Sequence, residues 1–132
     1  MTDLLPGAEA LGALTVFVLD VEAEAAFCRD ALGLTPVLAD EQSAVVRLGA
    51  TLLNMLRADA VGDLVAPARS AAVGETARML LSLWVDDVDA VCAELGRRGV
   101  PLLNGPVDQP WGKRTAAFRS PAGIVWEVAQ DL

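Results

Sequence analysis

One short pattern occurs twice in the sequence, and this repeat restricts the possible folds more than any other feature. Residues 18–23, VLDVEA, match residues 85–90, VDDVDA, and the two central aspartates, Asp20 and Asp87, lie 67 positions apart. Each copy follows a segment rich in strand-forming residues and precedes an apolar pattern with helical spacing. A repeat of this length predicts that the chain folds as two similar modules in tandem.

The first module is predicted to begin with a strand at Leu11–Leu19. Asp20 is a suitable N-cap for the helix that follows, because its carboxylate can accept a hydrogen bond from a free backbone N–H. Gly33 ends that helix as a C-cap. Turn-forming residues then separate short apolar runs that are typical of strands. We predict three such strands, at Leu34–Leu38, Ala44–Leu48 and Thr51–Leu56.

The second module repeats this order. A strand is predicted at Met79–Val85, and Asp87 is the N-cap of the helix that follows. The apolar face of this helix stops at Gly96 and Gly99. Another strand is predicted at Val100–Leu103, before a loop that contains a Gly-Pro pair.

A β-hairpin is predicted at Lys113–Gln130, because strand-forming segments flank a Ser-Pro-Ala-Gly turn. Residues 57–77 are polar and interrupted by glycine and proline, which is typical of a linker. The predicted architecture is one α+β domain of two βαβββ modules, at residues 11–58 and 79–131, joined by a linker at 59–78. A helix would cover one face of each sheet, so the two open faces could enclose a cavity.

Composition excludes several classes of function. No apolar run reaches the roughly 18 residues of a membrane span, and no basic N-terminal segment leads into an apolar one, so we expect a cytoplasmic protein. The net charge of −8 would repel nucleic acid and suits solubility or a cationic ligand. The chain has no histidine, which excludes histidine acid–base catalysis. Cys28 and Cys92 lie in helical patterns and are expected to be free thiols.

Several short motifs, in this order, carry a resemblance to a known family. They are V-x-D after the first strand, AFCRDALGL, WVDDVDAV, PWG-x-R and F-R-S-P-A-G-x-x-W-E. Together they resemble the vicinal oxygen chelate superfamily, which includes glyoxalase I, extradiol dioxygenases and bleomycin-resistance proteins, over residues 11–131. The resemblance implies paired βαβββ modules that form a cup-shaped, half-open barrel, usually within a homodimer.

In the metal-dependent members of this superfamily, the cup holds a divalent ion bound by His, Glu or Gln on equivalent strands. The matching positions here are Ala13 and Leu80 in the first strands, and Asn54 and Glu127 in the fourth strands. Alanine and leucine cannot bind a metal, and one carboxylate with one amide is too few good ligands for a catalytic site. We therefore expect no metal and no other cofactor. Ser120 also replaces the acidic residue that is usual before the hairpin turn.

Strand alternation predicts which side chains share the face of these positions and line the cup. Trp111 is expected to fold over the mouth, and Arg114 to reach Glu127 or an anionic group of the ligand. The predicted ligand-binding residues are Thr15, Phe17, Asn54, Ser82, Trp84, Trp111, Arg114 and Glu127. Two alternatives stay open: Phe17 and Trp84 fill the core, or Glu127 serves only as the ion-pair partner of Arg114.

The predicted function is metal-independent binding of a planar or cationic small molecule, such as an antibiotic, without catalysis. Aromatic walls would stack on the ligand, and the acidic charge would attract a cation. Two enzymatic alternatives stay open. One is a metal-dependent enzyme of the glyoxalase or dioxygenase type, which the lack of histidine disfavours, and the other is metal-free catalysis with Glu127 as general base. A homodimer would cover the sheet edges.

Overall fold

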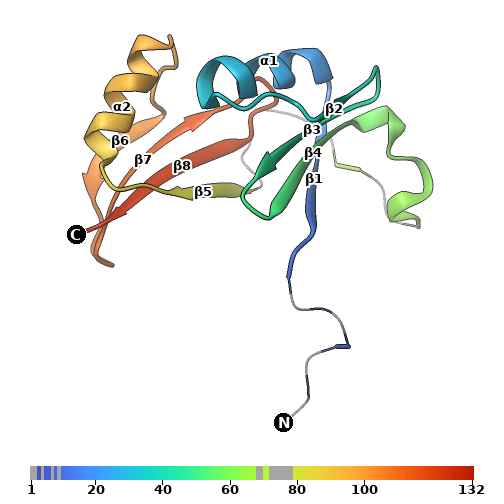
Figure 1. Ribbon diagram of the computed structural model, residues 1–132, viewed down its shortest axis with the longest axis horizontal. Coiled ribbons are helices and arrows are strands. Elements are labelled where there is room, and N and C mark those ends of the chain that lie inside the picture. Colours follow the sequence, from blue (N-terminus) through green and yellow to red (C-terminus); the bar gives the residue numbers. More distant parts are fainter. Residues whose placement is uncertain (1–2, 4, 7, 9, 68–69, 72–78) are drawn as a thin grey trace.

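The computed structural model describes residues 3, 5–6, 8, 10–67, 70–71 and 79–132 (Figure 1). The first module contains β1 (Ala13–Val18), α1 (Val21–Leu32), β2 (Leu38–Ala39), β3 (Ser43–Leu48) and β4 (Thr51–Arg57). The second contains β5 (Leu80–Trp84), α2 (Val88–Arg97), β6 (Asn104–Asp108), β7 (Lys113–Arg119) and β8 (Val125–Asp131). Two short 3-10 turns, Ala58–Ala60 and Gly62–Val65, follow β4. Residues 68–69 and 72–78 of the predicted linker lie outside the described residues.

Each module forms its own mixed four-stranded sheet, with the strand orders β1-β4-β3-β2 and β5-β8-β7-β6. In both sheets the first strand of the module runs parallel to the last, and the other neighbours are antiparallel. This arrangement confirms the predicted α+β class and the tandem βαβββ order. The described strands form two separate sheets and no closed barrel.

The repeated pattern marks the start of both helices, as predicted. Oδ1 of Asp20 accepts a hydrogen bond from the backbone N–H of Ala23 at 3.0 Å, and Asp87 accepts in the same way from Ala90 at 3.0 Å. Gly33 ends α1 in the left-handed conformation, with a φ of 71°. None of the described helices is long and apolar enough to cross a membrane.

The predicted strand at Leu34–Leu38 is wrong for most of its length. Only its last residue belongs to a strand, the two-residue β2. The segment begins by closing α1, since the N–H of Leu34 donates to the carbonyl of Cys28 at 2.8 Å. Pro36 has no N–H to contribute to a ladder. Pairing with β3 therefore starts only at Val37, whose N–H donates across to that strand.

The strand predicted at Val100–Leu103 is also misplaced, since β6 lies a few residues later along the chain. β6 contains the Gly105-Pro106 pair, and this pair of residues is typical of a loop. However, β6 is the edge strand of its sheet, and an edge strand tolerates proline because one row of its N–H groups has no strand partner. Gly105 lies so close to β7 that a Cβ atom there would be 2.5 Å from the carbonyl oxygen of Thr115.

Gly105→Ala is expected to lower the free energy of unfolding by about 2 kcal/mol, because the added methyl collides with β7 and a side chain is strained at φ +81°. Gly112→Ala is the matched control. Its φ is +86°, but no atom lies within 4 Å of the added Cβ, so it isolates the backbone strain and should cost about 1 kcal/mol. Urea denaturation measures both losses. Equal losses would contradict the close approach to Thr115.

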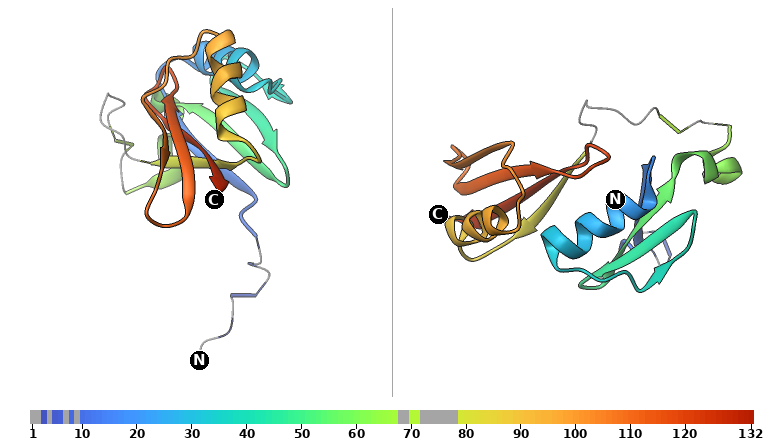
Figure 2. Two further views of the ribbon diagram at one scale, coloured as in Figure 1. Left: turned by 90° about the vertical axis from the view of Figure 1, so that its left-hand side faces the viewer. Right: turned by 90° about the horizontal axis from the view of Figure 1, so that it is seen from above.

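The buried side chains of both modules form one core, with each helix covering one face of its own sheet (Figures 1 and 2). Val18 of β1 and Val88 of α2 are fully buried in it. Phe118 of β7 is 1% exposed, and its ring centroid lies 6.2 Å from that of Phe27 in α1. Trp126 of β8 is buried in the same core, and it alternates with Glu127 on the other face of the sheet. The two modules therefore pack directly against each other.

A buried carboxylate also links the modules. Glu24 of α1 is 2% exposed, and its Oε1 accepts hydrogen bonds from the hydroxyl of Ser120, at 3.0 Å, and from the backbone N–H of Ala122. Burial raises the pKa of Glu24 above its ordinary value, although both hydrogen bonds act in the opposite direction. The carboxylate that is missing at position 120 is thus supplied by the helix of the other module.

Candidate functional site

The open face of the second sheet, opposite α2, brings together three of the predicted residues. Ser82 of β5 and Glu127 of β8 are register partners, and Oγ of Ser82 donates a hydrogen bond to Oε1 of Glu127 at 2.9 Å. Trp84 lies two residues further along β5, on the same face, and is 73% exposed. Glu127 is half-buried, so Ser82 orients its carboxylate while part of it stays accessible.

Lys113, at the start of β7, reaches the same face beside Trp84. Its Nζ lies 4.9 Å from the centroid of the Trp84 ring and also pairs with the carboxylate of Asp131, its register partner on β8. A cavity of about 360 Å³ opens at this point, lined by Trp84, Val85, Asp86, Lys113, Ala129 and Asp131. The sequence placed Lys113 only at the start of the predicted hairpin. The hairpin register, which sets Lys113 opposite Asp131, cannot be inferred from composition.

Arg114 does not reach Glu127. It is the register partner of Gln130, which places it on the opposite face of the sheet. Its guanidinium binds Asp108 of β6 and Asp89 of α2, each at 2.9 Å, and these two carboxylates raise the pKa of Arg114. The predicted contact between Arg114 and Glu127 is therefore wrong, and Arg114 instead connects α2 to the sheet. Glu127 has Ser82, and not an arginine, as its partner.

Trp111 lies in the turn between β6 and β7 and is 67% exposed. The turn is closed by a hydrogen bond from the N–H of Gly112 to the carbonyl of Gln109, at 3.1 Å. Within the described residues, Trp111 has no ring–ring or cation–ring contact. Its role as a cover over the mouth of the site stays a prediction.

The open face of the first sheet carries the other predicted residues. Thr15 of β1 and Asn54 of β4 are register partners, and Thr15 is exposed. Oδ1 of Asn54 is buried and has no hydrogen-bond donor among the described residues, so this face offers one uncommitted acceptor. Phe17 is half-buried and is not among the side chains of the shared core, which favours its predicted place on the open face.

The described residues do not join these two faces into one site. Among the described residues, no hydrogen bond or aromatic ring contact connects the open face that carries Thr15 with the open face that carries Ser82. The sheets meet at a smaller apolar cavity of about 310 Å³, between β5 and the turn that joins β3 to β4. Leucines of both modules line it, among them Leu14, Leu53 and Leu81. A single cup lined by all of the predicted residues stays a prediction.

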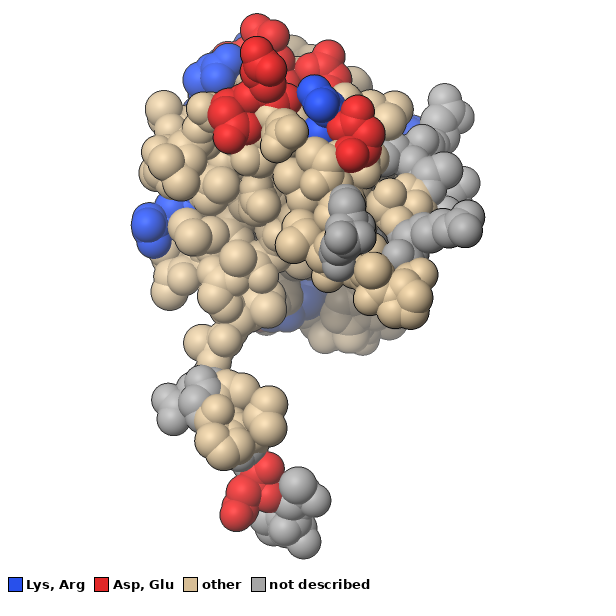
Figure 3. All heavy atoms as spheres, turned by 90° about the vertical axis from the view of Figure 1, so that its right-hand side faces the viewer, with Lys and Arg blue, Asp and Glu red and all other residues tan. Residues whose placement is uncertain are grey.

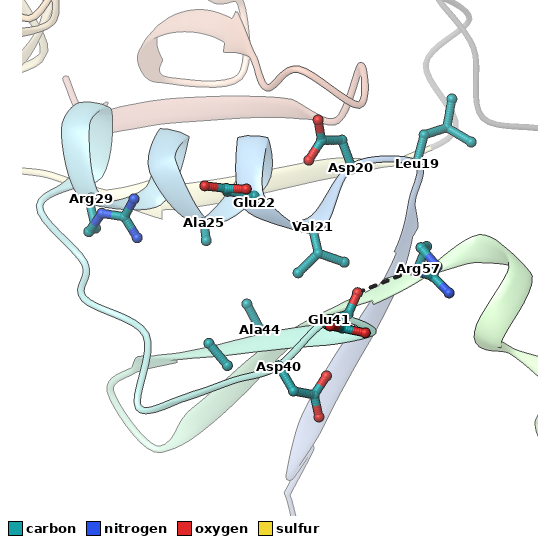
Figure 4. A pocket seen from close by; sticks show the side chains of 11 residues that line it. Leu19, Asp20, Val21, Glu22, Ala25, Arg29, Asp40, Glu41, Ala44 and Arg57 are labelled. Carbon is teal, nitrogen blue, oxygen red and sulfur yellow. Dashed lines mark hydrogen bonds between the residues drawn. The ribbon is translucent and has the colours of Figure 1, made fainter.

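A larger cavity, of about 760 Å³, lies on the helix side of the first sheet, between the start of α1 and β2 to β4 (Figure 4). Two of the four acidic residues in its lining, Asp20 and Asp40, stabilise local structure with their carboxylates. Asp20 caps α1, and Oδ1 of Asp40 accepts from two backbone N–H groups of the next turn, at 2.7 and 2.9 Å, which lowers the pKa of Asp40. Arg57 donates to the carbonyl oxygen of Glu41 at 3.4 Å. Strand and helix patterns could not reveal this cavity, because it arises between elements.

Charge is unevenly distributed on this side of the molecule. Seen from the side of the first module, most of the acidic side chains, with some basic ones among them, lie toward one end of the folded body. A further acidic group lies on the extension at the opposite end, and much of the face between them carries no charge (Figure 3). Large apolar side chains that are exposed in this module include Leu19, Val37 and Leu38. The acidic groups that carry the net charge therefore do not cover the whole surface.

The two cysteines differ in exposure, since Cys28 is buried and Cys92 is half-buried. Cys28 and Cys92 are both free, as predicted. Burial raises the pKa of Cys28 to about 11, so this side chain is a protonated thiol at neutral pH. Its sulfur lies 3.6 Å from that of Met55 within the core. Cys28 is therefore a packing residue and not a nucleophile.

The donor groups of the open faces do not fit the metal site that the resemblance implies. Among the described residues, no three His, Cys, Asp or Glu side chains lie close enough together to hold a metal ion. The positions expected for strong ligands carry Ala13 and Leu80, which leaves Asn54 of β4 and Glu127 of β8 as the only donors at the four matching positions. One carboxylate and one amide do not make a site for a catalytic transition metal.

Comparison with known sequences gives a family match over most of the chain. Residues 10–128 match the family described as the Glyoxalase/Bleomycin resistance protein/Dioxygenase superfamily. The sequence is also 31% identical over 124 residues to the uncharacterized protein YraH of Bacillus subtilis (strain 168). That alignment covers 90% of this chain and 96% of YraH.

Solved structures share the fold. A glyoxalase/bleomycin resistance protein/dioxygenase from Nocardioides matches with a TM-score of 0.81 at 23% identity, covering 99% of this chain and 87% of that chain. Lactoylglutathione lyase from Agrobacterium tumefaciens matches with a TM-score of 0.75 at 25% identity, covering 92% and 93% of the two chains. With its paired βαβββ modules and a family match from residue 10 to residue 128, the chain belongs to the glyoxalase/bleomycin resistance protein/dioxygenase superfamily.

Proposed function

We propose that the protein binds a planar or cationic small molecule, such as an antibiotic, on the open face of β5 and β8, and that it does so without a metal. The observation that carries this proposal is the exposed ring of Trp84 beside the hydrogen-bonded pair of Ser82 and Glu127. An exposed indole offers a stacking surface, and the nearby carboxylate offers a counter-charge for a ligand cation. Sequestration of a ligand needs these contacts and no catalytic group.

The charge of the whole chain supports a cationic ligand. A net charge of −8 produces a negative potential that raises the local concentration of cations and speeds their encounter with the protein. Anionic ligands would be repelled by the same field. The proposal therefore favours an aromatic compound with a positive charge over an acidic one of the same size.

A homodimer is part of this proposal. β1 and β2 are the outer strands of the first sheet, and β5 and β6 those of the second. Strand edges of this kind favour association with another chain. In this proposal, a second copy would also bring the open face of one chain toward the open face of another. The wall opposite Trp84 would then come from the partner.

Metal-free catalysis with Glu127 as general base is the second candidate. The hydrogen bond from Ser82 favours it, because it holds the carboxylate in one orientation on an accessible face. The Agrobacterium protein of similar structure is named as a lyase. Glu127→Gln separates the two candidates, since it would weaken binding of a cation moderately but abolish turnover by a general base.

Trp84→Ala is expected to weaken the binding of ethidium, a cationic aromatic dye, about tenfold, because the indole supplies both stacking and a cation–π contact. Glu127→Gln should weaken it less, about threefold, because its half-exposed charge is screened. Leu64→Ala removes another highly exposed apolar side chain, outside both sheets, and is the matched control. Titration calorimetry measures the ethidium affinities of the three variants and of the wild type. If Trp84→Ala bound the dye as tightly as the wild type, this placement of the site would be wrong.

A thermal-shift screen would identify the class of ligand. A ligand at 100 times its dissociation constant adds about 2.7 kcal/mol to the stability of the folded state, which is a shift of several degrees. We expect shifts with cationic aromatic antibiotics and none with glutathione conjugates. A clear shift with Ni²⁺, Zn²⁺, Mn²⁺ or Fe²⁺ would contradict the metal-independent proposal.

A further inference from the structure

We infer that Trp84, Asp86 and Asp131 form a subsite for an alkylammonium group, and that Lys113 of the same chain fills it until a ligand displaces it. The inference deepens the proposed function, on which it rests, because it names the ligand chemistry that the Trp84 end of the face would take. It also makes Lys113 a residue that sets specificity. The sequence pattern assigned no role to Lys113, Asp86 or Asp131 in binding.

The contacts of the Lys113 ammonium show what this position accepts. Nζ lies 4.9 Å from the centroid of the Trp84 ring and pairs with the carboxylate of Asp131. Asp86 is among the residues that line the same cavity of about 360 Å³. An ammonium group from outside the chain would find the same aromatic face and the same carboxylates. The Lys113 ammonium therefore occupies the position that we assign to the ammonium group of a ligand.

The charge balance favours exchange of one cation for another. With Lys113 in place, its ammonium pairs with Asp131, and Asp86 is a second acidic residue in the lining of the cavity. When Lys113 leaves, the carboxylate of Asp131 loses its ion-pair partner, and the lining keeps two acidic residues. A cationic ligand that replaces Lys113 restores the balance, whereas a neutral or anionic ligand does not. The subsite therefore selects compounds that carry an amine or a quaternary ammonium.

Lys113 is held loosely enough to be displaced. Its side chain is about one-third exposed, at 32%, and that of Asp131 is 85% exposed. An ion pair and a cation–π contact at exposed positions are each worth only a few-fold in an equilibrium constant. The four-carbon stem of lysine also gives the ammonium many other positions in solvent. Ligand binding must overcome these contacts, so Lys113 lowers the affinity for a cation by a modest factor.

The test uses n-butylammonium chloride, which has the atoms of the lysine side chain, and follows the indole N–H resonance of Trp84 by NMR. Lys113→Met keeps an apolar stem and removes the competing charge. We expect it to bind n-butylammonium about 5- to 10-fold more tightly than the wild type. Arg119→Met is the matched control, since it deletes one positive charge from the same strand and is expected to stay within about twofold of the wild type. Equal affinities for Lys113→Met and the wild type would overturn the inference.

A measurement without any ligand tests the contact itself. In the wild type, the Hε protons of Lys113 lie near the face of the indole and should show an upfield ring-current shift that Trp84→Ala abolishes. A Lys113 signal at the position of a free lysine would overturn the inference.

Ethidium binding distinguishes failure of this inference from failure of the proposed function. If Trp84→Ala weakens dye binding but Lys113→Met changes nothing, the subsite is wrong and the proposed function stands. If Lys113→Met tightens n-butylammonium binding but Trp84→Ala leaves ethidium binding unchanged, the placement of the planar ligand on Trp84 is wrong and only the binding of an ammonium group is supported.

Discussion

Phe118→Ala is expected to lower the free energy of unfolding by about 4 kcal/mol, because the substitution empties a large volume in the centre of the core. The side chain is 1% exposed and contacts the ring of Phe27 in the helix of the other module. The cavity would open where the two modules meet. Closing it would require the modules to shift relative to each other, which would disturb their other contacts. Denaturation by guanidinium chloride measures the loss.

Phe17→Ala is the matched control for this prediction. Phe17 is also a strand phenylalanine, but it is half-buried and lies on the open face of the first sheet. Its removal should lower the free energy of unfolding by only about 1 kcal/mol, since less apolar surface returns to water. A loss as large as that of Phe118→Ala would show that Phe17 fills the core, and would remove it from the candidate site.

Glu24→Ala is expected to lower the free energy of unfolding by about 3 kcal/mol, because it leaves the hydroxyl of Ser120 and the N–H of Ala122 without their acceptor. Glu24→Gln keeps an acceptor oxygen in the same place and should stay within about 1 kcal/mol of the wild type at neutral pH. Asp30→Ala, an exposed acidic position on the same helix, is the matched control and should cost less than about 0.5 kcal/mol. Equal stability of Glu24→Ala and Asp30→Ala would show that the link between the modules contributes nothing.

The same carboxyl group makes stability depend on pH. Burial raises the pKa of Glu24 above its ordinary 4.5, so the folded state binds the proton more tightly than the unfolded chain does. The stability that comes from this group is present below the unfolded pKa and is lost as the pH rises through the folded pKa. The wild type should therefore lose stability relative to Glu24→Gln as the pH rises from about 4.5. Urea denaturation of both proteins at several pH values measures the difference, and a gain with rising pH would contradict the raised pKa.

Local interactions explain which parts of the fold were predictable. Asp20 and Asp87 cap the two helices through hydrogen bonds to a residue only three positions away, so the sequence alone is sufficient to place them. The alternation that puts Trp126 in the core and Glu127 on the open face is equally local. β6 was misplaced because an edge strand is defined by its neighbour β7, and not by the strand propensity of its own residues.

The partners of the charged side chains were not predictable in the same way. Arg114 and Lys113 are adjacent in the sequence, yet they lie on opposite faces and bind different carboxylates. Which carboxylates they meet depends on the register of the hairpin, which sets Lys113 opposite Asp131 and Arg114 opposite Gln130. Once that register is known, alternation alone excludes a contact between Arg114 and Glu127.

The sequence by itself determined the family, the α+β class, the tandem order of the modules, the helix starts and the open-face positions of Ser82 and Glu127. These features follow from motifs, caps and periodicities that span a few residues. Only the tertiary structure decided that Lys113 occupies the face of Trp84 and that Glu24 meets Ser120, 96 residues away. Contacts between distant segments depend on how two sheets and two helices pack together, and no local pattern in the chain encodes that packing.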